Sequence, residues 1–162
     1  MKRTMRIGSI IKILSDSPNK LFRLNYFSNL FGAAKSSISE DISQCKEIVA
    51  RMDLGLIETV AGAKGGVRFI PYVTNRQCLL AQEKLCSLLR SPDRILGGGF
   101  LYTSDIMFNP GIVNLLAPIF ARKFAESGAD YIVTIETKGI PLALATSHLL
   151  GLSTIVVRRE TK

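Results

Sequence analysis

One amphipathic stretch, Ala34–Met52, constrains the fold of this chain more than any other segment. Apolar residues recur there at steps of three and four, which predicts a helix with a single buried face. These apolar residues are Ile38, Ile42, Cys45, Ile48, Val49 and Met52. Ser37 and Glu40 have the spacing of a capping box, so we expect them to cap the start of this helix. By itself the pattern also fits an ordinary amphipathic surface helix.

Two shorter predicted helices precede this stretch. Residues 4–14 carry apolar side chains at helical spacing, and residues 24–32 form a second short helix that Asn25 can cap and Gly32 can end. Three helices with a tight connection between the second and the third are typical of a helix-turn-helix, whose last helix reads DNA. The small hydroxyls and the lysine at the start of that helix would fit phosphates and base edges.

A β-hairpin is predicted directly after the third helix. Residues 55–60 alternate as a strand does, residues 61–66 form a glycine-rich turn, and residues 67–72 return as a second strand. We expect Lys64 and Arg68 at the tip of this hairpin, where both cations could contact a phosphate backbone or a minor groove. The glycine pair alone also fits a plain hairpin turn. The order of three helices and a basic hairpin predicts a winged helix over residues 1–74.

Charge and composition favour a polyanion partner. The net charge is +8, with 11 basic against 6 acidic residues in positions 1–74 and 10 against 7 in positions 75–162. Residues Cys45, Cys78 and Cys86 have no metal-site spacing, and we expect buried or half-buried free thiols in a reducing compartment. No apolar run approaches the ~20 residues that span a bilayer, so we expect a cytoplasmic protein with no membrane contact.

The second half of the chain predicts helices around a small parallel sheet. Residues 73–91 form a helix that Pro92 ends, and Asn109 caps a helix that begins at Pro110. Between them, the glycine-rich residues 96–104 lead into a short strand. The triple glycine lacks the lysine of a phosphate-binding P-loop, so we interpret it as a bend.

A strand-helix-strand unit follows, with strands at 130–135 and 154–157 and a helix at 142–150. The first strand is continuously apolar, as expected in a parallel sheet that is covered on both faces. Thr137, Lys138 and Gly139 follow its carboxyl end, where loop N–H groups and a lysine could hold an anion. An ordinary turn with a solvated lysine fits equally well. His148 has no partner at metal-ligand spacing, so we expect a packing or surface role.

Four segments together resemble the purine operon repressor family. They are AKSSISED (34–41), GGVRFIP (65–71), DRILGGGFLYTSDI (93–106) and TKGIPLALA (137–145). The resemblance implies an α/β chain in which a winged-helix DNA-binding domain at 1–74 precedes a type I phosphoribosyltransferase-like domain, here incomplete, at 75–162. It implies a homodimeric repressor of purine biosynthesis genes that binds double-stranded operator DNA and is released by phosphoribosyl pyrophosphate (PRPP) or a related nucleotide. No cofactor and no metal are implied.

The family pattern also assigns residues by position. Contacts to DNA would come from Lys35, Ser36, Ser37, Ser39, Lys64 and Arg68. The pyrophosphate loop would consist of Thr137, Lys138, Gly139 and Ile140, with Tyr102 and Asp105 near the same sheet edge. No residue is assigned a catalytic role, because the transferase-like domain would sense its ligand.

The sequence departs from the family pattern in its second half. The family's acidic pair and the Gly-Gly-Thr loop that binds the ribose 5-phosphate do not occur in the sequence. We therefore expect the sequence to be the N-terminal part of a family member, with an apolar strand edge left unpaired at 154–157. The alternative function, a purine phosphoribosyltransferase enzyme, is disfavoured by the same absence. A third possibility is an isolated DNA-binding module that does not fold beyond residue 90.

Overall fold

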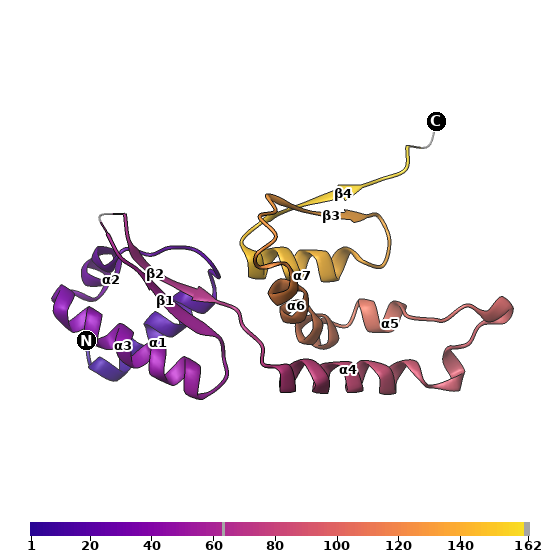
Figure 1. The fold of residues 1–162 in the computed structure, drawn as a ribbon, viewed down its shortest axis with the longest axis horizontal. Helices are drawn as coiled ribbons and strands as arrows, with labels where there is room; N and C mark the ends of the chain where they lie inside the picture. The colour runs from indigo at the N-terminus through magenta and orange to yellow at the C-terminus, as the bar shows by residue number, and fades with distance from the viewer. Residues whose placement is uncertain (63, 161–162) are drawn as a thin grey trace. The chain divides into compact units, whose positions relative to one another are not determined.

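The computed structural model describes residues 1–62 and 64–160, and its contacts divide the chain into two units, Met1–Tyr72 and Val73–Lys162 (Figure 1). Ala63 of the predicted hairpin turn, and Thr161 and Lys162 of the predicted second domain, lie outside the described residues. Helices and two small sheets alternate along the chain, which confirms the predicted α/β class. The division into a DNA-binding domain at 1–74 and a transferase-like domain at 75–162 stays a prediction.

The first unit contains three helices followed by an antiparallel hairpin, in the predicted order. Its elements are α1 (Arg3–Ser15), α2 (Leu24–Phe31), α3 (Lys35–Arg51), β1 (Leu56–Val60) and β2 (Gly66–Ile70). Gly32 ends α2 in the left-handed conformation, with φ 59°, as predicted. Asn25 does not cap α2, because the helix begins one residue earlier with Arg23 at the N-cap.

One apolar core joins all five of these elements. It is formed by Ile10, Leu14, Phe22, Phe27, Ile38, Ile42, Cys45, Val49, Ile57, Val67 and Phe69. The predicted stripe on α3 is therefore right in its central part. It is wrong at the end of the helix, because Ile48 is 39% exposed and Met52 is 65% exposed. Ile48 lies near the C-terminal end of α3, and Met52 is its C-cap residue.

A buried carboxylate on α3 was not predicted. Asp41 is 1% exposed and accepts a hydrogen bond from Arg3 Nε at 3.1 Å and one from Arg6 Nε at 2.6 Å. The two arginines come from the first turns of α1, and the hydrogen bond to Asp41 raises the pKa of Arg6. A buried charge needs such partners, so this cluster fixes the start of α1 against the middle of α3.

The second unit contains helices and a two-stranded parallel sheet. Its longer elements are α4 (Asn75–Leu89), α5 (Ser104–Met107), α6 (Pro110–Phe124), β3 (Tyr131–Ile135), α7 (Ile140–Leu150) and β4 (Ser153–Val157). Strand β3 pairs with β4 from Tyr131 opposite Ser153 to Ile135 opposite Val157, which confirms the predicted strand-helix-strand unit. The side chain of Asn109 accepts hydrogen bonds from the N–H groups of Gly111 and Ile112, so it caps α6 as predicted.

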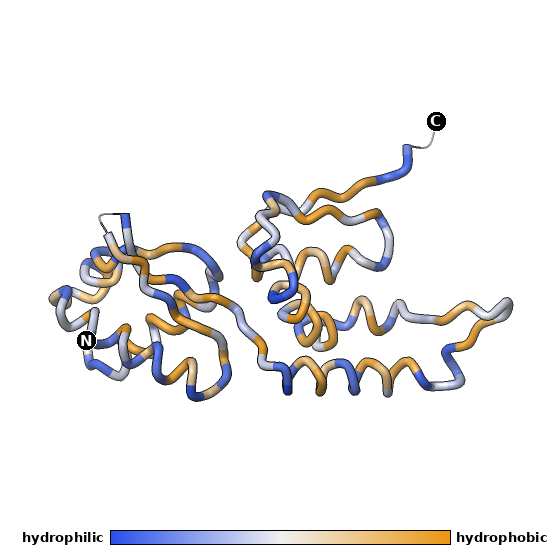
Figure 2. Tube along the Cα trace, viewed as in Figure 1, coloured by the Kyte–Doolittle hydropathy of each residue, from blue (hydrophilic) through white to orange (hydrophobic). Residues whose placement is uncertain are grey.

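Two predictions for this unit are wrong. Residues 96–104 form no strand: they contain the 3₁₀ turn Gly97–Gly99, and Leu101 forms an isolated bridge with Ile95, which precedes the segment. Among the described residues, the sheet is covered on one face only, where α7 packs (Figure 1). The other face exposes the apolar side chains of Tyr131, Val133, Ile135, Ile155 and Val157. The hydrophobic colouring of both strands is visible along the trace in Figure 2. The continuous apolar sequence of β3 therefore does not correspond to burial on both sides.

The remaining sequence expectations concern thiols and membranes. All three cysteines are free; Cys45 is buried and Cys78 is half-buried, but Cys86 is exposed, contrary to the prediction. His148 lies exposed in the last turn of α7, which agrees with the second of the two predicted roles, packing or surface. Within residues 1–62 and 64–160, no helix is both long and apolar enough to cross a membrane.

Candidate functional site

The first turns of α3 present a polar surface to solvent. Lys35, Ser36 and Ser39 are exposed, and Ser37 is half-buried. Ile38 lies between them in sequence and is fully buried, which anchors this turn to the core. The four residues predicted to contact DNA on this helix thus lie on or next to one accessible surface. Their role in binding stays a prediction.

The predicted capping box at Ser37 and Glu40 is wrong. Helix α3 begins at Lys35 with Ala34 at the N-cap, and no side chain caps it. Ser37 is therefore already inside the first turn, and Glu40 lies near Arg3 of α1, with 4.0 Å between Glu40 Oε2 and Arg3 Nη2. A capping box does occur at α4, where Thr74 and Gln77 cap each other reciprocally. The same sequence spacing marks both places, so spacing alone did not identify the helix start.

The hairpin holds its two predicted cations in different environments. Arg68 is not at the tip but in the middle of β2, directly opposite Glu58 of β1. Its Nε atom lies 2.6 Å from Glu58 Oε2, so an intramolecular carboxylate already partners this charge. Lys64 lies in the turn and is exposed. Of the two cations, Lys64 is thus the one that lies in the turn and is exposed to solvent.

The glycine turn of the hairpin packs against the segment before α2. Phe22 and Val67 exchange backbone hydrogen bonds of 2.9 and 2.8 Å. A Cβ atom at Gly66 would overlap the carbonyl group of Phe22, and one at Gly65 would overlap that of Val60. Glycine at these two positions therefore permits the close approach of hairpin and chain.

A groove next to α3 brings together residues that the sequence analysis did not connect. It has a volume of about 490 Å³ and lies between the starts of α2 and α3 and the hairpin turn. Arg23, Asn25 and Lys35 line it together with glycines of the turn. Arg23 and Asn25 were not among the predicted DNA contacts. The available signal was their position directly before and within the second predicted helix, which the helix-turn-helix order places beside the third.

In the second unit, the predicted anion loop joins β3 to α7. Thr137 and Lys138 are exposed, and Gly139 is the N-cap residue of α7, which begins at Ile140. The Nζ atom of Lys138 lies 5.9 Å from the centre of the Tyr102 ring, so the structure brings these two predicted residues together.

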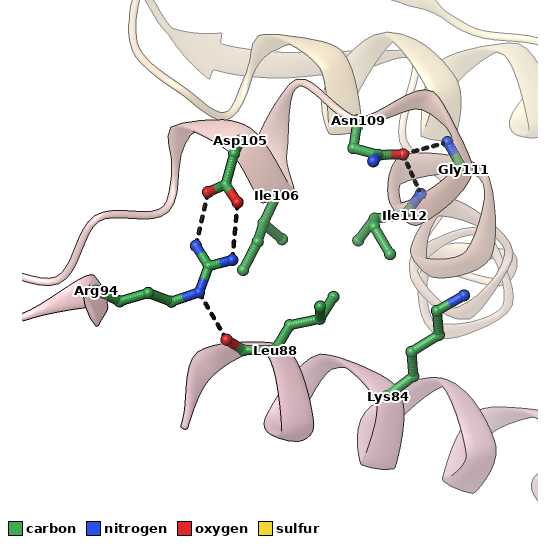
Figure 3. A pocket seen from close by; sticks show the side chains of 8 residues that line it. All are labelled: Lys84, Leu88, Arg94, Asp105, Ile106, Asn109, Gly111 and Ile112. Carbon is green, nitrogen blue, oxygen red and sulfur yellow. Dashed lines mark hydrogen bonds and ion pairs between the residues drawn. The ribbon is translucent and has the colours of Figure 1, made fainter. Parts of the chain in front are cut away.

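Asp105 instead forms a bidentate ion pair with Arg94. Both oxygens of Asp105 accept hydrogen bonds of 2.7 Å from the guanidinium group (Figure 3). These bonds lower the pKa of Asp105, and they raise the pKa of Arg94. Arg94 Nε also donates to the carbonyl oxygen of Leu88 at 2.6 Å. The pair thus fixes α5 next to the end of α4, which is a structural role for Asp105.

The pocket beside this ion pair has a volume of about 280 Å³. Lys84 extends into it from α4, and Asn109 and Ile112 form the side that belongs to α6 (Figure 3). The side chain of Asn109 already occupies the N–H groups at the start of α6. Among the described residues, no group of three His, Cys, Asp or Glu side chains could hold a metal ion.

Comparison with known proteins gives a family match for the first unit and a similarity to purine regulators over the whole chain. Residues 2–71 match the family described as "Bacterial purine repressor, N-terminal". Over the whole chain, the sequence is 39% identical to the "Purine biosynthesis transcriptional activator PurR" of Lactococcus lactis subsp. lactis, of which it covers 60%. Over 99% of the chain, it is 36% identical to the "Purine biosynthesis transcriptional repressor PurR" of Bacillus subtilis, of which it covers 56%.

A weaker similarity concerns part of the chain. Over 55% of its length, the chain is 29% identical to an orotate phosphoribosyltransferase of Methanosarcina acetivorans, of which it covers 50%. The chain spans about 60% of the length of the curated purine regulators that it matches. Residues 2–71, with their three helices and hairpin, therefore belong to the bacterial purine repressor N-terminal domain family, and the whole chain is similar to PurR regulators.

Proposed function

We propose that this chain binds double-stranded DNA upstream of purine biosynthesis genes and regulates their transcription. The observation that carries the proposal is the accessible first turn of α3, which presents Lys35, Ser36 and Ser39 while buried Ile38 anchors it. Hydroxyls can contact base edges or phosphates, and a lysine adds attraction to the phosphate backbone. The names of the relatives support the proposal.

Those names include both an activator and a repressor. What the two activities share is binding to DNA near the regulated genes, so we propose that binding as the function of the first unit. For the direction of regulation we propose repression, as the family resemblance implies. A reporter gene fused to the upstream DNA tests it: expression should rise when the gene for this chain is deleted. A fall would contradict repression and leave the proposed DNA binding intact.

The DNA proposal is tested by fluorescence anisotropy with the full chain. The probes are a duplex from the upstream region of the organism's own purine genes and a duplex of scrambled sequence. We expect the first to bind more tightly, with an affinity that falls steeply as salt increases. Ser36→Ala should reduce the preference for the first duplex, by about tenfold if a base contact worth roughly 1–3 kcal/mol is lost.

Ser43→Ala is the matched control, because Ser43 lies on the same helix and its Oγ atom donates to the carbonyl oxygen of Ser39. This variant should retain the wild-type preference. Equal affinity of the wild-type chain for both duplexes at all salt concentrations would contradict the proposed function.

We also propose that the second unit senses PRPP through Thr137, Lys138, Gly139 and Ile140, without turning it over, and that the chain acts as a homodimer. The exposed Lys138 beside Tyr102 supports an anion site at this loop. Calorimetry with PRPP should show binding that Lys138→Ala weakens about tenfold, a loss of ~1.4 kcal/mol. Lys123→Ala, an exposed control on α6, should have no effect.

Two further measurements test the other parts of this proposal. An assay for base-dependent release of pyrophosphate should give no turnover, and turnover would instead support the alternative, a purine phosphoribosyltransferase. Light scattering coupled to size-exclusion chromatography should give the mass of a dimer. A monomer at micromolar concentration would contradict the proposed oligomeric state.

A further inference from the structure

The groove between α2, α3 and the hairpin turn differs from the rest of the first unit in its charge. Arg23 and Lys35 line it, and no acidic residue does. Five other basic side chains of this unit have carboxylate partners: Arg3 and Arg6 pair with Asp41, Lys12 with Asp16, Arg51 with Glu47, and Arg68 with Glu58. Within the described residues, neither Arg23 nor Lys35 forms an ion pair.

The walls of the groove leave these two charges accessible. Three of the lining residues, Gly62, Gly65 and Gly66, have no side chain, so one wall is formed largely by backbone. Neither α2 nor α3 has an acidic residue in its first turn or a side-chain cap. No negative group of the described part of the chain therefore competes for this space. A negatively charged group from outside can approach both cations together.

The position of the groove indicates which anion it receives. Lys35 belongs both to the groove and to the exposed first turn of α3, on which the proposed function rests. When that turn faces a DNA major groove, the phosphates of the adjoining strand pass beside it. A volume of about 490 Å³ is large enough for a phosphate group with part of its sugar.

We propose that this groove binds a backbone phosphate of the duplex and that Arg23 is a DNA-contacting residue. This inference rests on the proposed DNA-binding function and adds a residue and a contact to it. Arg23 and Lys35 hold the phosphate from two sides, which fixes the duplex between α3 and the hairpin. Because a phosphate is present at every step of DNA, the contact contributes affinity without sequence preference. Arg68 already forms an ion pair with Glu58, so it contributes less to the affinity for DNA.

The test is Arg23→Ala in the full chain, with the upstream and the scrambled duplex and a series of salt concentrations. We expect affinity for both duplexes to fall about five- to tenfold, and the slope of log affinity against log salt to decrease by about one. Arg23→Lys should recover most of the loss, because it keeps the charge. Arg51→Ala is the matched control. Arg51 is an exposed arginine at the C-terminal end of α3, and it forms an ion pair with Glu47. It should stay within twofold of the wild type.

The other possible results distinguish a phosphate contact by Arg23 from its alternatives. If the wild-type chain prefers the upstream duplex but Arg23→Ala binds as Arg51→Ala does, the inference is overturned and the proposed function stands. If Arg23→Ala loses affinity for only one duplex, Arg23 reads sequence and the phosphate assignment is wrong. If Arg23→Ala abolishes binding of inorganic phosphate but leaves DNA affinity unchanged, the groove serves a free anion. A wild-type chain that binds neither duplex overturns both proposals. Circular dichroism must show that all variants remain folded.

Discussion

The two units of this chain bury their apolar residues to very different extents. In the first unit, three helices and the hairpin share one core, and Phe27, Ile10 and Leu14 are fully buried. In the second unit, Val133 and Ile135 of the sheet are each more than half exposed to solvent. Parallel sheets in proteins are ordinarily covered on both faces. The difference teaches that the first unit buries its apolar residues in one shared core, whereas the described part of the second unit leaves one apolar face of its sheet exposed.

The largest expected effect tests this comparison directly. Phe27→Ala removes a fully buried ring and should lower the free energy of unfolding of the first unit by about 4 kcal/mol. Ile135→Ala, on the open face of the sheet, should change the stability of the second unit by less than about 0.5 kcal/mol. Hydrogen exchange of peptides from residues 1–72 and 73–160 measures each unit separately. An Ile135→Ala effect as large as that of Phe27→Ala would show that the open face is covered in solution.

A smaller effect should come from pH and should be confined to the first unit. Burial, and secondarily the charge of Asp41, raises the pKa of Cys45 from 9.0 to about 11. The folded thiol therefore holds its proton more tightly than the unfolded one, so this contribution is complete below pH 9 and decreases as pH rises toward 11. We expect the first unit to lose roughly 2 kcal/mol over this range.

Two cysteine variants isolate this pH effect. Cys45→Ala should remove it from urea titrations at each pH, whereas Cys86→Ala, which changes an exposed thiol of the second unit, should leave it intact. An unchanged slope in Cys45→Ala would assign the loss of stability to other groups.

The smallest expected effect concerns the two sites with capping-box spacing. Thr74→Ala removes a side chain that accepts the N–H of Gln77, and it should destabilise the start of α4 by about 1 kcal/mol. Ser37→Ala changes the same kind of residue inside α3, where it caps nothing, and should be nearly neutral for stability. Hydrogen exchange at the first turns of α4 and α3 is the measurement. A larger loss in Ser37→Ala would restore the capping role predicted from sequence.

Sequence periodicity predicted the helices and strands well because most of them are amphipathic. Ile38, Ile42 and Val49 lie where the spacing of α3 places them. Local spacing could not reveal Asp41 as a core residue, because its partners Arg3 and Arg6 lie on another helix, more than thirty positions away in the sequence. Such a pairing becomes visible only when the packing of α1 against α3 is known.

At the candidate site too, local sequence spacing predicted exposed residues but not contacts between distant parts of the chain. Lys35, Ser36 and Ser39 were predicted to be accessible, and they are. The pairing of Arg68 with Glu58 depends on the register of the hairpin, and the sequence analysis did not fix that register. Arg23 belongs to the groove only because the hairpin turn folds back on the segment before α2. Residues that act through tertiary neighbours are therefore the ones that sequence alone did not identify.

The ion cluster at Asp41 has a practical consequence for handling this protein. Arg3 and Arg6 neutralise that carboxylate, and Arg6 also donates to the carbonyl oxygen of Met1 at 3.1 Å. A trimmed start that removes Arg3 and Arg6 would leave the buried carboxylate of Asp41 without these two partners, on the helix that carries the exposed serines. The first six residues are therefore best kept intact when the proposed DNA binding is measured, because their loss would destabilise α3 and imitate a defect in its DNA contacts.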